Sequence, residues 1–154
     1  MGRTGSFEEG VAGVDDNRTP GDDVVVVRPA EEVMGRQALP YFVGISGSSA
    51  GATGISMNLV VVPPGGAAEP HVHRGFETAV YLLKGRVTVR YGFDLREELG
   101  LEAGDFLFIR ADIAHQPVNL SRSEPAWAIV ARNDPNEQES IERFGPVDLV
   151  QVDE

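Results

Sequence analysis

The sequence predicts a single all-β domain, folded as a sandwich or closed barrel. Short apolar runs recur along the chain and are separated by frequent turn-forming residues, 18 glycines and 10 prolines. No long stretch shows the 3.6-residue apolar period of an amphipathic helix. A chain of 154 residues can bury one core without disulfide support, and this one has no cysteine.

The first predicted strand is the valine run at 24–28, because β-branched residues favour extended backbone. Strands follow at 41–45 and 55–62, on either side of the glycine-rich stretch SGSSAGATG at 46–54. That stretch lacks the Gly-Lys-Ser/Thr ending of a phosphate-binding loop, so we predict a flexible hairpin loop. The strand at 55–62 runs into a Pro-Gly turn at 63–66.

The second half of the chain continues the same pattern. Residues 95–100, LREELG, are predicted as a brief helical turn or a loop between paired strands, and residues 135–144 as a short helix. The remaining expected strands are short apolar runs bounded by turn residues. They cover residues 77–83, 86–91, 105–109, 115–120 and 125–132.

The net charge of −11 is concentrated at the two ends of the chain. We expect a flexible acidic arm at 1–22, the barrel at 23–134, and an acidic segment at 135–154. Acidic flanks disfavour nucleic-acid binding, because phosphates would be repelled. No apolar run is long enough to span a bilayer, and the amino-terminal residues lack the apolar core of a signal peptide, so a cytoplasmic location is expected.

The only histidines of the chain are His71, His73 and His115, and Glu77 lies four residues after the second. Residues two apart on a strand point the same way, so His71 and His73 can converge on one ion. Glu77 and His115 can complete a shell that suits Zn, Fe, Mn, Ni or Cu. The alternative is three ordinary polar residues, but no histidine is left over. We therefore expect one divalent transition metal per subunit.

Strand alternation also predicts which neighbours face this site. If Glu77 faces the interior, Ala79, Tyr81 and Leu83 share its face. The pocket is then mostly apolar, and Glu77 and Tyr81 are its titratable groups, which makes them the predicted catalytic residues.

Four other side chains near the site have two interpretations each. Arg74, beside the ligands, either steers an anionic substrate or is simply solvent-exposed. The aromatic residues Phe106, Phe108 and Trp127 either close the pocket or, as is commoner, pack elsewhere.

Two motifs in this arrangement resemble those of the cupins. The first motif is a Gly, five residues, His-x-His, three or four residues, Glu, six residues and Gly. Here Gly65, His71, His73, Glu77 and Gly85 match it, except that seven residues separate the last two.

The second motif is matched by Gly104, His115 and Asn119. Its usual Pro and Gly are replaced by Arg110 and Asp112. Asp enters the left-handed turn conformation at modest cost, so the turn is expected to survive.

The resemblance implies a jelly-roll β-barrel, a small-molecule ligand or substrate, and a homodimer. It implies dioxygenase, isomerase or cyclase chemistry at the metal, and the lack of a second acid or base favours the dioxygenase type. The alternative is a sensor or storage domain that binds a small molecule without turnover, and fold analogy does not decide between them.

Overall fold

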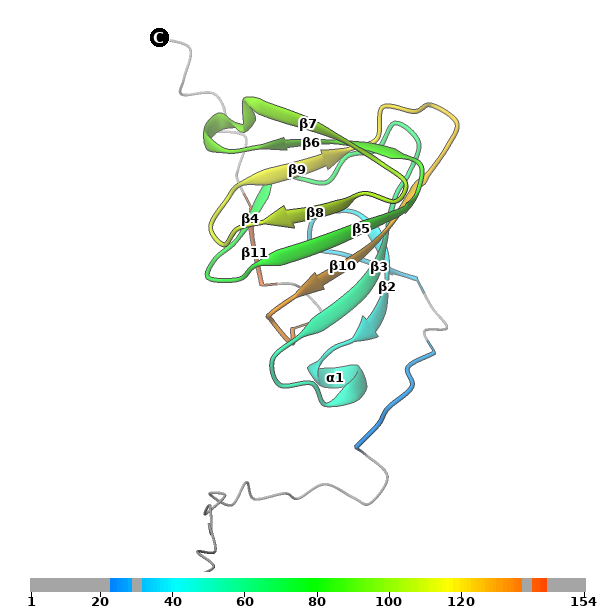
Figure 1. The fold of residues 1–154 in the computed structure, drawn as a ribbon, viewed down its shortest axis with the longest axis vertical. Coiled ribbons are helices and arrows are strands. Elements are labelled where there is room, and N and C mark those ends of the chain that lie inside the picture. The colour runs from blue at the N-terminus through cyan, green and yellow to red at the C-terminus, as the bar shows by residue number, and fades with distance from the viewer. Residues whose placement is uncertain (1–22, 29–31, 137–139, 144–154) are drawn as a thin grey trace, which may run out of the picture.

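Two antiparallel β-sheets face each other across a shared core in the computed structural model, which describes residues 23–28, 32–136 and 140–143 (Figure 1). One sheet has the strand order β1-β2-β3-β10-β5-β8, and the other has the order β11-β4-β9-β6-β7. The all-β jelly-roll prediction is confirmed. The strands are β1 (Val33–Met34), β2 (Pro40–Ile45), β3 (Ser56–Val62), β4 (His71–His73), β5 (Thr78–Lys84), β6 (Arg86–Tyr91), β7 (Glu97–Glu102), β8 (Phe106–Ile109), β9 (His115–Val118), β10 (Ala126–Arg132) and β11 (Ile141–Arg143).

The core forms because alternate residues of the strands point between the two sheets. In β10, Ala126, Ala128, Val130 and Arg132 are buried, whereas the residues between them are only half-buried. Both sheets contribute to one cluster of buried side chains. Its members are Leu39, Tyr41, Val60, Val62, Ala68, Leu82, Val87, Val89, Leu101, Ala126, Ala128 and Val130.

Gly85 connects β5, in the six-stranded sheet, to β6, in the five-stranded sheet. Its φ of 85° lies in the left-handed region, and a Cβ there would lie 2.8 Å from the carbonyl oxygen of Pro125. Only glycine fits this position without a shift of the backbone. The glycine that ends the first motif therefore fixes the corner between the sheets.

The valine run at 24–28 was wrongly predicted as a strand. It runs away from the barrel, and Val24 and Val26 are exposed (Figure 1). In the described part of the chain no strand pairs with it. High β-propensity gives extended backbone, but a strand also needs a partner.

Three further elements differ from the predictions. The stretch at 95–100 forms most of β7, which pairs along its whole length with β6 after the 3-10 turn η1 (Phe93–Leu95). The predicted helix at 135–144 is wrong, because β11 pairs there with β4. The hairpin loop at 46–54 does join β2 to β3, but it contains a helical turn, α1 (Gly47–Ala50), capped by Ser46.

The predicted arm at 1–22 lies outside the described residues. Within the ranges that the structure describes, no helix is long and apolar enough to cross a membrane.

Candidate metal centre

The three histidines come together at one end of the five-stranded sheet. His71 and His73 are the first and last residues of β4, and His115, the first residue of β9, pairs directly with His71. All three are buried, and one ring nitrogen from each lies within 4.8 Å of the others. The predicted convergence is therefore confirmed for these three residues.

Backbone hydrogen bonds set the tautomer of two of these rings. The Nδ1–H of His71 donates to the Glu69 carbonyl oxygen at 2.6 Å, and that of His115 donates to the Ile113 carbonyl oxygen at 2.9 Å. A carbonyl oxygen only accepts, so the proton is on Nδ1 and Nε2 keeps its lone pair. Such outer bonds are the usual means of orienting a metal-binding histidine.

Burial also keeps His71 neutral. Desolvation lowers its pKa from 6.5 to about 4, an effect that the Glu69 bond opposes and the charge of Arg132 reinforces. At neutral pH the imidazole is then already deprotonated, which is the form that binds metal. Three buried nitrogen donors of this kind fit a divalent first-row metal and leave coordination positions for other ligands.

Glu77, the predicted fourth ligand, is not brought into this group. It precedes β5, its side chain is exposed, and its backbone N–H donates to Asn133 Oδ1 at 2.8 Å. The group that can hold a metal, among the residues the structure describes, contains the histidines alone.

The predicted alternation of β5 was wrong by one residue. Thr78 and Leu82 are buried and line the interior with Val80, whereas Leu83 is exposed. Tyr81 lies on the outer face, where its ring is 4.7 Å from that of Phe106, so it does not reach the predicted pocket. A shift of one residue exchanges the two faces of a strand completely.

Thr78, rather than Glu77, satisfies both spacings of the first motif. Four residues separate it from His73, and six separate it from Gly85. The turn at Gly75 therefore carries one more residue than was assumed, and a threonine occupies the interior position where the motif usually has its glutamate.

An interior cavity of about 80 Å³ adjoins two of the histidines. Its wall is apolar except for five side chains. One water needs ~10–15 Å³ of such volume. The cavity therefore has room for a molecule of a few non-hydrogen atoms. The polar side chains that line it are Gln37, His71, Thr78, His115 and Arg132.

Three of these polar residues were not predicted. Thr78 was placed on the wrong face, and Gln37 lies in a connection without a motif. Arg132, however, carries a signal in the sequence, because it continues the alternation of Ala126, Ala128 and Val130 toward the core. A charged residue at an interior position of a strand is uncommon and marks a candidate site.

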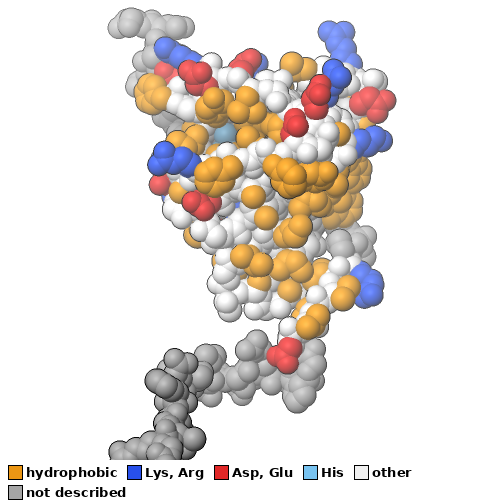
Figure 2. All heavy atoms as spheres, viewed as in Figure 1, with side chains coloured by type: hydrophobic (Ala, Val, Ile, Leu, Met, Phe, Trp, Pro, Cys, Tyr) orange, Lys and Arg blue, Asp and Glu red, His pale blue; other side chains and the backbone are white. Residues whose placement is uncertain are grey.

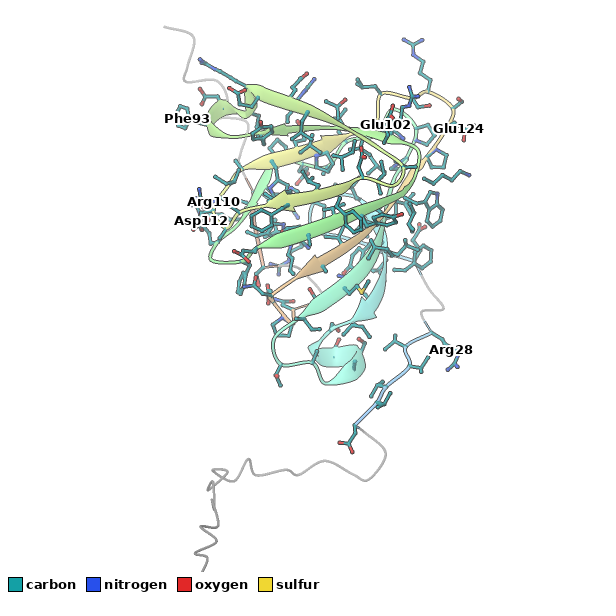
Figure 3. All side chains as sticks on the ribbon, viewed as in Figure 1. Arg28, Phe93, Glu102, Arg110, Asp112 and Glu124 are labelled. Atoms are coloured by element: carbon teal, nitrogen blue, oxygen red, sulfur yellow. The ribbon has the colours of Figure 1, made fainter. Side chains whose placement is uncertain are left out.

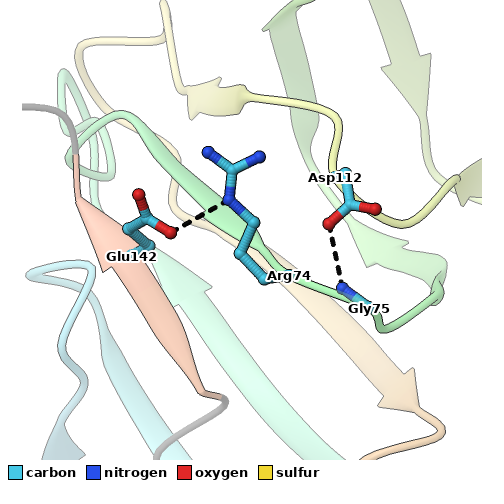
Figure 4. Close-up of polar contacts among 4 residues, drawn as sticks. All are labelled: Arg74, Gly75, Asp112 and Glu142. Atoms are coloured by element: carbon cyan, nitrogen blue, oxygen red, sulfur yellow. Dashed lines mark hydrogen bonds and ion pairs between the residues drawn. The ribbon is translucent and has the colours of Figure 1, made fainter.

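The second-motif loop holds the first-motif loop in place, as Figure 4 shows. Asp112 has φ 67°, as expected for a residue that replaces glycine, and its Oδ1 accepts the Gly75 N–H at 2.9 Å. Its own N–H donates to the His73 carbonyl oxygen at 3.1 Å. Asp112 and Arg110 lie at the end of the barrel opposite Glu102 and Glu124 (Figure 3).

Two other predicted neighbours have structural roles. Arg74 is half-exposed, and its Nε donates to Glu142 of β11 at 2.9 Å, which favours the solvent-exposed interpretation (Figure 4). Asn119 is buried and donates to the carbonyl oxygens of Val62 and Glu124 at 3.0 and 2.7 Å, so it organises a turn. The aromatic residues Phe106, Phe108 and Trp127 are absent from the cavity wall.

A family model described as a cupin domain matches residues 58–131, the segment that contains both motifs. Comparison with curated proteins gives no match.

Solved structures share the fold. An oxalate decarboxylase from Lactobacillus farciminis, in a formate complex, is 22% identical with a TM-score of 0.62, over 74% of this chain and 33% of that one. A putative sugar phosphate isomerase from Acidithiobacillus ferrooxidans is 22% identical with a TM-score of 0.55, over 69% and 67%. The oxalate decarboxylase of Bacillus subtilis, described with Mn(II) centres, is 19% identical with a TM-score of 0.61, over 77% and 30%. This chain therefore spans about a third of the length of the decarboxylases.

Proposed function

We propose that this chain, a member of the cupin superfamily, is a metal-dependent enzyme that acts on a small oxygenated organic molecule, with dioxygenase-type chemistry favoured. The observation that carries the proposal is the three-histidine centre beside a mostly apolar cavity. A divalent metal held there supplies open coordination positions and can activate dioxygen or polarise a carbonyl group. Fold similarity to enzymes of different activity does not by itself select the reaction.

The composition of the cavity wall favours metal-centred oxidation over isomerisation. Shifting a proton along a carbon skeleton needs a positioned base and acid. The lining residues of the described chain include no carboxylate, and Tyr81 lies outside the cavity. The lining histidines, His71 and His115, belong to the metal-binding group. A mostly apolar wall disfavours water beside the metal, which would protect a reactive centre from side reactions.

Oxygen uptake tests this proposal. Protein stripped of metal and reloaded with Fe(II) or Mn(II) is expected to consume dioxygen with a member of a panel of catechols, diketones and hydroxy acids. The zinc-loaded protein is the matched control, because zinc has the same charge but no redox chemistry. A protein that consumes no oxygen in any metal form, yet binds a small ligand tightly, would support the sensor alternative instead.

We also infer that two copies of the chain associate through the outer face of the six-stranded sheet. Apolar side chains gather on this face, as Figure 2 shows. Leu83 is 47% exposed, Phe106 84% and Phe108 61%, on the neighbouring strands β5 and β8. A patch of this kind is unusual on a monomer, and the small cupins that the chain resembles commonly pair.

Analytical ultracentrifugation should therefore give twice the chain mass of 16.6 kDa. Phe108→Glu places a charge in the interface and should shift the species to the monomer. Phe93→Glu is the control, since Phe93 is 87% exposed in η1, at the end of the other sheet. A wild type that sediments as a monomer would contradict the inference.

A further inference from the structure

Strand β8 is an uncovered edge of the six-stranded sheet. It pairs with β5 on one side, and among the described residues no strand pairs with its other side. All four of its residues are apolar, whereas β7, the longest edge strand of the other sheet, contains three glutamates. Edge strands usually carry such charges or are covered, because an open apolar edge attracts further strands. β8 therefore has the features of an edge that another strand covers.

Residues 23–28 have the complementary property, a strand-forming sequence without a sheet. Residues 24–27 are four consecutive valines, whose branched side chains favour extended backbone. Val24 is 83% exposed and Val26 66%, and the segment runs away from the barrel (Figure 1). Burial of such side chains against another surface is favourable.

The charges at the two ends of this segment fit β8 in one orientation. Residues 23–28 read Asp-Val-Val-Val-Val-Arg, and residues 105–110 read Asp-Phe-Leu-Phe-Ile-Arg. In antiparallel pairing without offset, the Asp of each segment lies opposite the Arg of the other, which stabilises the pair. Parallel pairing would bring like charges together. Asp105 and Arg110 are both exposed, so their side chains face the solvent from which a strand would approach.

The same antiparallel register matches the apolar side chains on both faces of the added strand. Val24 and Val26 would share a face with Ile109 and Leu107, and these two residues line a groove of about 440 Å³ that residues of β6 and β7 also line. The other two valines would lie beside the exposed phenylalanines of β8. Cross-strand pairs of this kind are the unit of sheet stability.

The chain cannot bring residues 23–28 to its own β8. β1 and β8 are the two edges of the sheet, so five strand spacings, or ~24 Å measured over the sheet, separate them. The five Cα–Cα steps from residue 28 to residue 33 span at most ~18 Å. Figure 3 shows Arg28 and Arg110 on opposite sides of the molecule. A segment that covers β8 would therefore come from a second copy of the chain.

We propose that two copies of the chain exchange residues 23–28, and that each segment adds to the β8 of the other copy as an antiparallel strand. Asp23 then lies opposite Arg110, and Arg28 lies opposite Asp105. The exchange goes beyond the association of the outer sheet faces, since it assigns a partner to a particular segment and a particular edge.

Disulfide trapping tests the register, because the chain has no cysteine of its own. Val25→Cys combined with Phe108→Cys places two thiols opposite each other, at a Cα separation of ~4.5–5.5 Å that a disulfide spans. Mild oxidation should convert most of the protein to a covalent dimer, and mass spectrometry should identify the link between residues 25 and 108. The control is Val25→Cys with Phe93→Cys, because Phe93 is as exposed but lies in η1. It should stay monomeric on a non-reducing gel.

Charge reversal tests the orientation. Asp23→Arg places like charges opposite each other at two symmetric contacts, and it should raise the dimer dissociation constant by about threefold to thirtyfold in sedimentation. Arg110→Asp should have the same effect, and the double variant should return to within about twofold of wild type. Glu124→Arg is the control, since it makes the same change of charge at the other end of the barrel (Figure 3). It should leave the dissociation constant within about twofold.

Neither measurement uses a metal or a substrate, so the result does not depend on the proposed enzyme activity. A link between residues 25 and 108 of different chains supports the exchange. A dimer that forms no such link and is insensitive to Asp23→Arg supports association of the sheet faces alone and overturns the exchange. A monomeric wild type, or a link within one chain, also overturns it. If Phe108→Cys alone dissociates the dimer, rescue by the double charge reversal decides.

Discussion

His73→Ala is expected to reduce bound metal from one ion per chain to a trace after dialysis. The three histidines supply every donor of the group that can hold a metal in the described chain. Residues that merely orient ligands change metal affinity by about 10–100-fold when replaced, so loss of a ligand should cost more than ~100-fold. Elemental analysis of protein purified without a metal-binding tag measures the effect.

Glu77→Gln is the informative companion to this variant. The sequence alone made Glu77 the fourth ligand, whereas the structure leaves its side chain exposed. We therefore expect Glu77→Gln to keep its metal. Retention of a full complement of metal by His73→Ala would contradict the three-histidine centre, and loss of metal from Glu77→Gln would return Glu77 to the ligand set.

The part of the site that the sequence predicted depends on local spacing. His71 and His73 share a face of any strand, and His115 follows a glycine at the distance that the second motif requires. The identity of the histidine group therefore did not depend on where each strand begins. Strands such as β6 and β10 were also predictable, because their side chains alternate and apolar residues mark the face toward the core.

The face of β5 could not be predicted in the same way. It depends on the residue count of the turn at Gly75, and the backbone of that turn is held by Asp112, 37 positions further along the chain. The motif has six residues between its glutamate and its last glycine, whereas seven separate Glu77 from Gly85. This difference was the sign in the sequence that the turn contains one more residue than was assumed. β7 was missed for a different reason. Gly100 interrupts the alternation of apolar and polar side chains along this strand, and its run of charged residues resembles the surface of a helix.

Thr78→Glu is expected to strengthen metal binding. The interior position of Thr78 satisfies both spacings of the first motif, so a glutamate there would point toward the histidine group. A carboxylate near a divalent cation should raise metal affinity by at least about tenfold.

The matched control is Ala79→Glu, which adds the same side chain one residue later on the exposed outer face. It should leave the metal affinity unchanged, because adjacent residues of a strand point in opposite directions. Competition with a chromophoric chelator measures the metal affinity. If Ala79→Glu strengthens metal binding and Thr78→Glu does not, Ala79 faces the interior, as the sequence predicted for β5. If Thr78→Glu alone does so, also in a Glu77→Gln background, the ligand position of the motif belongs to residue 78.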